Sequence, residues 1–171
     1  MPNGERKWVY DKLWPDQLQW IANEAATLKA QGYKDAIMML HMPLYCYRAA
    51  ALTAFPEGHG GDSEKYGQQH ELIASHPFED GVLTVLKETD LINHVLAGHD
   101  HCNNFMIEHE GIMLMFACKT GPGCYWQSAM NGGTITSIGA DGIKDVHHEL
   151  IDVKHLVEGK GITEFVYNWD K

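Results

Sequence analysis

Residues 91–101 read LINHVLAGHDH, and this stretch decides how the rest of the chain is interpreted. Its first seven residues are mostly apolar, which is typical of a strand buried on both faces in a sheet flanked by helices. Gly98 ends the run, and His99, Asp100 and His101 follow it directly. Because open α/β sheets bind ligands beyond the carboxyl ends of their strands, the stretch predicts a buried strand with a functional loop at its end.

A second segment has the same design. Residues 36–41, AIMMLH, form an apolar run that ends in His41 and is stopped by Pro43, so a second strand buried on both faces is expected. A helix is predicted before it, beginning at Pro15 and ending at Gly32. Its apolar positions recur at helical spacing: Leu18, Ile21, Ala22, Ala25 and Leu28. A helix, a short loop and a buried strand make half of an α/β unit.

The rest of the chain is expected to add a short helix and two hairpins. The helix covers residues 80–88 and leads into the 91–97 strand. Strands over 105–108 and 112–116 flank a Glu-Gly turn, and a second hairpin runs over 134–150 around an Asp-Gly pair, a strong turn signal. The predicted fold class is therefore α/β, with a mixed sheet and antiparallel C-terminal hairpins.

Two regions have no clear periodicity. Residues 45–77 are rich in Ala, Gly and His and are interpreted as a long loop, which in a compact domain is usually functional or mobile. Residues 163–167 form either a last edge strand or part of a loose tail. Since no linker or repeat divides the chain, residues 1–171 are expected to form a single domain.

The composition limits the classes of function. The chain has 171 residues, 44% of them hydrophobic, and a formal net charge of -10. An acidic surface repels phosphate backbones, so nucleic-acid binding is not expected. No apolar run approaches the roughly 18 residues of a membrane span, so no membrane partner is expected either. The sequence does not start with a signal peptide, which slightly favours the cytoplasm.

The four cysteines lack the CxxC spacing of metal or redox motifs. They are Cys46, Cys102, Cys118 and Cys124. Free thiols in a reducing compartment are expected, with a Cys118–Cys124 bridge as the alternative.

Histidine stands out among the residue types, with 11 copies, and it is the commonest metal ligand. His99 and His101 are one residue apart, so both side chains can point to the same side of an extended segment. Imidazoles at a rigid strand end suit zinc, iron or manganese. The alternative is that this pair, and a single strand-end histidine such as His41, are ordinary surface or core residues.

Three segments, in order, resemble the calcineurin-like metallophosphoesterases, most closely the purple-acid-phosphatase-related branch. Residues 17–20 (QLQW) resemble the helix that precedes the first histidine strand. Residues 41–44 (HMPL) resemble the next motif, and residues 98–105 (GHDHCNNF) resemble a GHDH-x-N-x-F run. The resemblance covers about residues 13–126 and implies half of a β-sandwich flanked by helices.

The resemblance also implies metal-dependent hydrolysis of a phosphoester substrate. Carried over by position, His41 and His99 would ligate one divalent ion and His101 another, so one or two ions of Fe, Mn or Zn are expected. Such ions hold a hydroxide that attacks phosphorus. Asp100 would orient a ligand rather than bind metal, and Asn103 is expected near the ligands or the substrate.

The chain departs from the family before the helix that begins at residue 15. The D-x-H, G-D-x-x-D and G-N-H motifs expected there are absent, so the chain resembles a truncated, C-terminal half of a phosphoesterase. The 36–41 strand is then expected to expose an apolar edge and face, which a missing N-terminal half or a homo-oligomer would cover. The alternative function is a catalytically silent remnant that acts as a metal-binding or interaction module.

The other histidines carry weaker hypotheses. His59, His70 and His76 lie in the long loop and are expected near the substrate phosphate or, alternatively, in solvent. Asn93 and His94 are interpreted as residues of the 91–97 strand.

Overall fold

The computed structural model describes residues 10–169. Its helices are α1 (Pro15–Ala30), α2 (Cys46–Ala54), α3 (Val82–Thr89) and α4 (Lys154–Val157), with a 3-10 turn at Ser128–Met130. Its strands are β1 (Ala36–Leu40), β2 (Gly61–Ser63), β3 (Gly67–Gln69), β4 (Ile92–Ala97), β5 (Met106–His109), β6 (Ile112–Phe116), β7 (Gly132–Gly139) and β8 (Gly142–Leu150).

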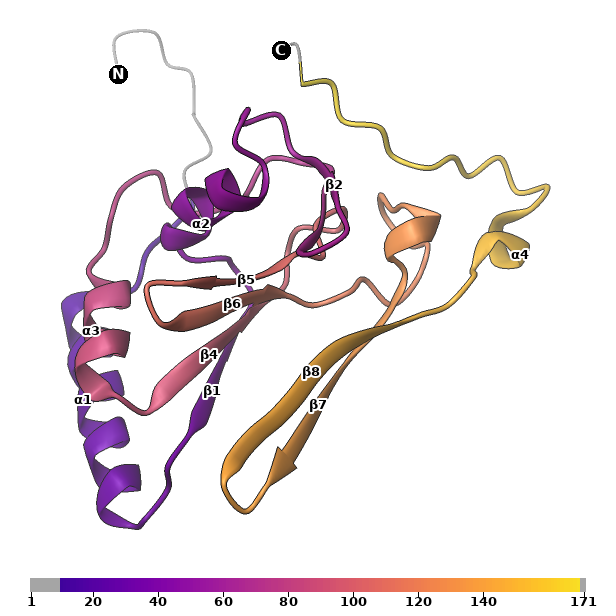
Figure 1. Cartoon of the computed structure of the whole chain (residues 1–171). Coiled ribbons are helices and arrows are strands. Elements are labelled where there is room, and N and C mark those ends of the chain that lie inside the picture. The colour runs from indigo at the N-terminus through magenta and orange to yellow at the C-terminus, as the bar shows by residue number, and fades with distance from the viewer. Residues whose placement is uncertain (1–9, 170–171) are drawn as a thin grey trace, which may run out of the picture.

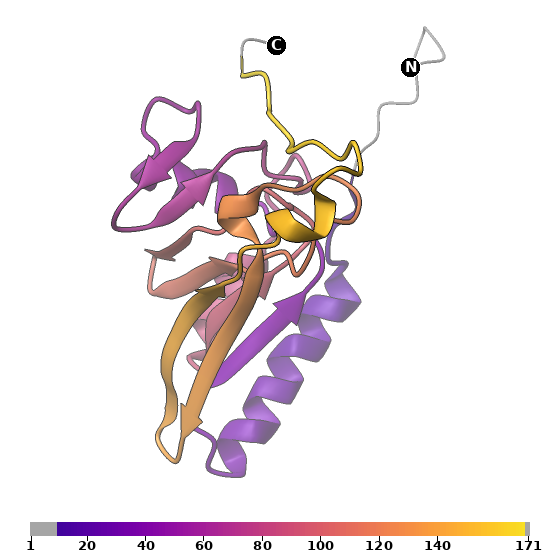
Figure 2. The same cartoon turned by 90° about the vertical axis from the view of Figure 1, so that its right-hand side faces the viewer.

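The elements are arranged in layers around one mixed sheet (Figure 1). This four-stranded sheet has the order β1-β4-β6-β5, in which β1, β4 and β6 are parallel and β5 is antiparallel to β6. α1 and α3 cover one face, and the antiparallel β7–β8 hairpin lies over the other (Figure 2). The predicted α/β class, with a mixed sheet and an antiparallel C-terminal hairpin, is confirmed.

α1 confirms the helix predicted at the start of the chain. Pro15 stands in its first turn, where a missing N–H costs little. Gly32 follows its end with φ of +91°, in the left-handed region that favours glycine. The buried side chains of α1 are Ile21 and Ala25, and the helix packs against α3.

β1 lies at an edge of the sheet, which corrects one prediction. Among the strands of residues 10–169, β1 pairs only with β4, and Met39 is 70% exposed. The prediction that this strand is buried on both faces is therefore wrong. An apolar strand here needs a neighbour on its outer side, and the described part of the chain places none there. The unpaired backbone of β1 can accept another strand.

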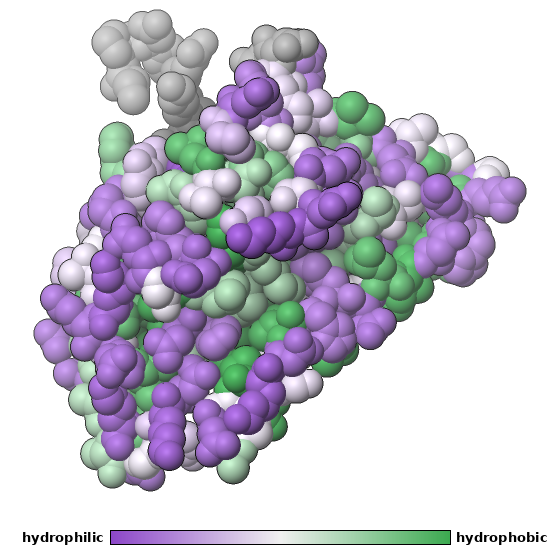
Figure 3. Space-filling model, viewed as in Figure 1, coloured by the Kyte–Doolittle hydropathy of each residue, from purple (hydrophilic) through white to green (hydrophobic). Residues whose placement is uncertain are grey.

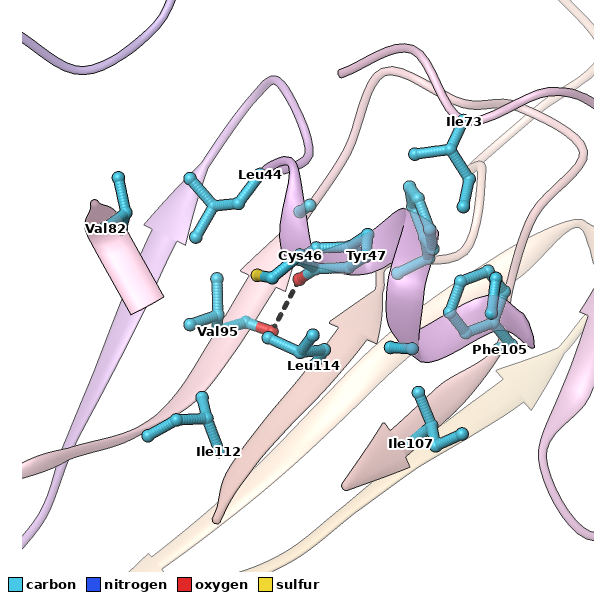
Figure 4. Packing of buried hydrophobic residues seen from close by; sticks show 14 of the residues in the cluster. Leu44, Cys46, Tyr47, Ile73, Val82, Val95, Phe105, Ile107, Ile112 and Leu114 are labelled. Carbon is cyan, nitrogen blue, oxygen red and sulfur yellow. Dashed lines mark hydrogen bonds between the residues drawn. The ribbon is translucent and has the colours of Figure 1, made fainter. Parts of the chain in front are cut away.

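The hydrophobic core lies between α2 and the sheet (Figure 4). Tyr47 is fully buried, and its ring contacts Phe116 with centroids 5.0 Å apart and Phe105 with centroids 6.4 Å apart. The Tyr47 hydroxyl is 3.0 Å from the carbonyl oxygens of both Val95 and Met115. One phenol therefore connects α2 to β4 and to β6.

Both predicted hairpins are present, and the second one is attached to the sheet at its tip. Asp35, which precedes β1, accepts the Ile143 N–H at 3.1 Å. Figure 3 shows hydrophobic surface in the space between the sheet and this hairpin. The hairpin and the residue after it also expose large apolar side chains: Ile138 (69%), Leu150 (55%) and Ile151 (60%).

Residues 45–77 contain more regular structure than predicted. The long-loop prediction is wrong, because α2 occupies 46–54 and β2 and β3 form a short hairpin. α2 begins without a side-chain cap, and β2 and β3 have three residues each and no large apolar side chain. None of these elements carries the periodicity or cap on which the sequence prediction depends.

The C-terminal segment is not a strand, so of the two alternatives for residues 163–167 the edge strand is wrong. The segment is nevertheless held in place by hydrogen bonds. The Phe165 N–H donates to the Trp126 carbonyl at 2.8 Å, and Gln127 Nε2 donates to the Phe165 carbonyl at 2.8 Å.

Two further expectations concern cysteines and membranes. All four cysteines are free, so the alternative of a Cys118–Cys124 bridge is wrong. Within residues 10–169, no helix is long and apolar enough to cross a membrane.

Candidate functional site

His41 and His99 lie side by side at one rim of the sheet. They follow the neighbouring parallel strands β1 and β4, whose last residues, Leu40 and Ala97, are paired. The two imidazole rings have centroids 5.3 Å apart at an interplanar angle of 66°. The Gly98 N–H donates to the His41 carbonyl at 3.0 Å, which fixes the end of β1 against the end of β4. The sheet thus brings together two histidines that are far apart in the sequence.

The backbone of His99 adopts an uncommon conformation. Its φ is +68°, in the left-handed region, where a non-glycine residue costs about 1 kcal/mol or more. Such conformations persist where the surroundings hold them, and they cluster at functional sites. His99 Nδ1 lies 3.1 Å from Asp100 Oδ1, so the opposite nitrogen, Nε2, points away from this carboxyl group.

Asp100 is an interior group rather than an exposed ligand. It is 3% exposed, and its Oδ2 accepts a hydrogen bond from Asn103 Nδ2 at 2.9 Å. The Ala74 N–H approaches both of its oxygens, at 3.3 and 3.4 Å. Burial and the negative charge of the neighbouring Glu71 raise the pKa of Asp100 to about 8. Asp100 therefore supports the His99 ring from within the protein.

The His101 ring contacts Tyr125, whereas the rings of His41 and His99 contact each other. Its Nδ1 donates to the Tyr125 carbonyl at 2.8 Å, and its ring stacks on the Tyr125 ring with centroids 4.0 Å apart. Because a carbonyl only accepts, Nδ1 carries the proton and a neutral ring keeps a lone pair on Nε2. This is how metal-binding histidines are commonly oriented by a backbone oxygen.

The described residues do not form a complete metal-binding group. Within residues 10–169, no three His, Cys, Asp or Glu side chains are grouped so that they could hold a metal ion. Catalytic zinc sites have three protein ligands and an open position. The His41–His99 pair therefore fits part of such a site, and it lacks at least one donor.

Glu71 and Tyr125 support this rim, and sequence reasoning did not identify them. Tyr125 donates its hydroxyl proton to Glu71 Oε2 at 2.8 Å, and the other oxygen of Glu71 accepts the Cys102 N–H. Burial and this carboxylate raise the pKa of Tyr125. No short motif connects two residues that are 54 positions apart, so only the fold shows this contact.

Of the two remaining predicted site residues, Asn103 is connected to His99 through Asp100, and His59 lies at the surface near the C-terminal segment. Asn103 is 1% exposed and joins neighbouring segments, since its Oδ1 accepts the N–H groups of His70 (3.1 Å) and Glu71 (3.2 Å). His59 is exposed and lines a surface cavity near the C-terminal segment, with Tyr167 and Trp169.

His70, one of the loop histidines, makes two polar contacts with other side chains. Its Nε2 is 2.7 Å from Asp62 Oδ1, and its Nδ1 is 2.5 Å from Gln127 Oε1. His76 makes a local contact with the backbone of Phe78. His94 lies in β4, as predicted, beside Asp35.

Comparisons of the chain with protein-family models, with curated proteins and with solved structures give no match. The family resemblance therefore depends on the sequence motifs alone, and the site is interpreted from its own geometry.

Proposed function

We propose that this chain carries part of the active site of a metal-dependent phosphoester hydrolase. The observation that carries the proposal is the pairing of His41 and His99, with ring centroids 5.3 Å apart, at the carboxyl ends of neighbouring parallel strands. Ligands of α/β sheets bind at such a rim, and imidazole suits iron, manganese and zinc.

The proposed ligands for one divalent ion are His41 and His99, and His101 is the proposed ligand for a second. The position of His101 apart from the pair, with its Nδ1 on the Tyr125 carbonyl, supports a division between two ions. A bound ion would lower the pKa of a water molecule and neutralise charge on phosphoryl oxygens. Asp100 contacts Nδ1 of His99 and would hold that ring in position.

Further metal ligands can be supplied at the edge of the sheet, beside β1. β1 is the edge strand, Met39 on it is 70% exposed, and His41 follows it directly. A strand added alongside β1 would end near the same rim, so residues at its end could complete the ligand set. Another chain that contributes such a strand, or a second copy of this chain, is the proposed source.

A metal-binding and turnover experiment tests the proposal. The protein is incubated with Mn²⁺, Fe²⁺ or Zn²⁺ and with a chromogenic phosphomonoester or phosphodiester. The expected result is hydrolysis that His41→Ala, His99→Ala and His101→Ala each abolish, while His155→Ala, which changes an exposed histidine of α4, has no effect. Turnover that survives all three site variants would refute the assignment.

A second candidate function is a catalytically silent metal-binding or interaction module. It is favoured by the incomplete donor set, since no three potential ligands are grouped within residues 10–169. Metal binding that depends on His41 and His99 but gives no turnover of either ester would support this alternative. If no metal binds, both functions are wrong.

A further inference from the structure

A cavity of about 470 Å³ lies between α2 and the segment 69–74. Its volume is within the range of small-molecule binding sites, about 300–1,000 Å³. Most of its wall is apolar and comes from both sides: Ala51, Leu52, Phe55, Leu72 and Ile73. Leu52 is 55% exposed and Leu72 is 57% exposed, so two large apolar side chains remain accessible to solvent at this cavity.

Arg48 provides a positive charge in this apolar lining. Its Nε donates to Ser75 Oγ at 2.6 Å, and one terminal nitrogen, Nη2, donates to the carbonyls of Ile73 (3.3 Å) and Ser75 (3.1 Å). These acceptors are neutral, and Arg48 forms no ion pair with a carboxylate of residues 10–169. The guanidinium is therefore held in place by neutral acceptors without a direct ion pair, and Asp100, the acid with which it interacts electrostatically, has a pKa raised to about 8.

The cavity is next to the histidine rim. Tyr10 lines the cavity, and its ring also contacts His99 with centroids 5.1 Å apart. Ala74 also lines the cavity, and it donates its N–H to Asp100. A molecule in the cavity would thus lie beside the residues that support His99.

We propose that this cavity binds an amphiphilic anion, a molecule with an alkyl or aryl body and a carboxylate or phosphate at one end. The body would occupy the apolar space between Leu52, Phe55 and Leu72. The anionic end would pair with Arg48, whose second terminal nitrogen, Nη1, has no hydrogen-bond partner among residues 10–169. A fixed cation that makes no direct ion pair with an acid of residues 10–169 favours an anion over a neutral or cationic molecule of the same shape. This binding does not depend on a metal ion or on hydrolysis.

A matched ligand series tests the proposal on the metal-free protein. Octanoate, octyl phosphate, octanol and octylammonium share one tail and differ in the head group, and backbone amide NMR shifts locate each of them. Octanoate or octyl phosphate is expected to bind at residues 48–58 and 69–74 at least tenfold more tightly than octanol, with octylammonium weaker still. The two anionic arms distinguish a carboxylate from a phosphate ligand. Hexanoate is expected to bind about tenfold more weakly than octanoate, since each methylene contributes about threefold to fourfold.

Three variants separate this site from nonspecific apolar binding. Leu52→Glu places a negative charge at the cavity and is expected to weaken octanoate binding by at least tenfold. Ile138→Glu, at an exposed apolar residue of β7, is the control and is expected to leave binding unchanged. Arg48→Gln is expected to equalise octanoate and octanol. Equal binding of the four ligands to the unmodified protein, shifts outside the two segments, or octanoate binding that resists Leu52→Glu would each overturn the proposal.

Discussion

The imidazole of His101 lies flat against the phenol ring of Tyr125, with centroids 4.0 Å apart and planes inclined by 17°. The Tyr125 carbonyl oxygen also accepts a hydrogen bond from His101 Nδ1. The same residue therefore fixes both the position and the tautomer of the imidazole. His41 and His99 are instead positioned by the ends of β1 and β4, so the three histidines of the candidate site depend on different parts of the fold.

The Tyr47 hydroxyl is predicted to contribute measurably to stability. Tyr47→Phe removes the group that lies 3.0 Å from the Val95 and Met115 carbonyls and accepts the Met115 N–H at 3.2 Å. Because a buried N–H then loses an acceptor, the free energy of unfolding should fall by about 1–3 kcal/mol in urea denaturation. Tyr33→Phe, at a side chain that is 58% exposed, is the control and should change it by less than about 0.5 kcal/mol. Equal effects would contradict the role assigned to the Tyr47 hydroxyl.

Asp100 is predicted to make stability fall as pH rises. Its pKa is about 8 in the folded protein, and in the unfolded chain it is near 3.8, the ordinary value for aspartate. Between these two pKa values the folded state keeps a proton that the unfolded state has released. The contribution of protonated Asp100 to the free energy of unfolding, which is complete below about pH 4, is therefore lost as the pH rises toward 8. Asp100→Asn, which stays neutral, should reduce the difference in unfolding free energy between pH 5 and pH 8. The control, Glu57→Gln at an exposed residue, should leave this difference unchanged. If Asp100→Asn also leaves the difference unchanged, Asp100 is not the source of the pH dependence.

Gly142 is predicted to be needed for attachment of the β7–β8 hairpin. A Cβ atom at Gly142 would lie 2.6 Å from Asp35 Cβ, whereas one at Gly111 would meet nothing within 4 Å. Both glycines have positive φ, +106° and +85°, so Ala strains the backbone in either position. Gly142→Ala should therefore cost more than Gly111→Ala in urea denaturation, and it should accelerate amide exchange in residues 142–149. Similar costs and unchanged exchange would argue against the close packing of Asp35 and Gly142.

The exposed edge at β1 is predicted to make the chain self-associate in the absence of another partner. Met39→Lys places a charge on the edge strand, at a side chain that is 70% exposed, and should reduce association without loss of folding. Sedimentation velocity over a range of concentrations measures the change. Val166→Lys, at an 84% exposed residue outside the sheet, is the control. A protein that stays monomeric at every concentration would contradict this prediction.

Metal affinity is predicted to depend on the histidine pair. His99→Ala should raise the dissociation constant for Zn²⁺ or Mn²⁺ by about tenfold or more in calorimetric titrations, because one of two paired donors is removed. His155→Ala should leave it unchanged. If both variants bind metal like the unmodified protein, the ion is held somewhere else.

The sequence correctly predicts the helices and hairpins whose signals, such as apolar spacing and turn residues, lie within the element itself. α1 has helical apolar spacing, a proline at its start and a glycine after its end, and the turn glycines of both hairpins are placed correctly. α2 was missed because nine residues, CYRAAALTA, carry no cap and no charged pair, and its helical state depends on packing Tyr47 into the core. The strand-end positions of His41 and His99 follow from the sequence, and their adjacency follows from the parallel pairing of β1 and β4.

The parts of the candidate site that the sequence does not predict all depend on tertiary contacts. Glu71 and Tyr125 meet across 54 positions, and neither lies in a motif. The apolar run of β1 by itself predicts burial on both faces, because it does not reveal whether a neighbouring strand is present, and the exposed edge is expected only from the family motifs that the chain lacks. The open outer side of β1 is a property of the sheet order, which local patterns do not contain.

The hydrogen bonds of Phe165 to residues 126–127 also determine the order in which the molecule can be completed. The Phe165 ring contacts the Tyr125 ring with centroids 5.0 Å apart, on a residue that in turn holds His101. A chain made from its N-terminus on the ribosome can pair β1 with β4 long before residue 165 has emerged. The His41–His99 pair can therefore form before residue 165 is synthesised, whereas the contact of Phe165 with Tyr125, beside His101, can form only afterwards.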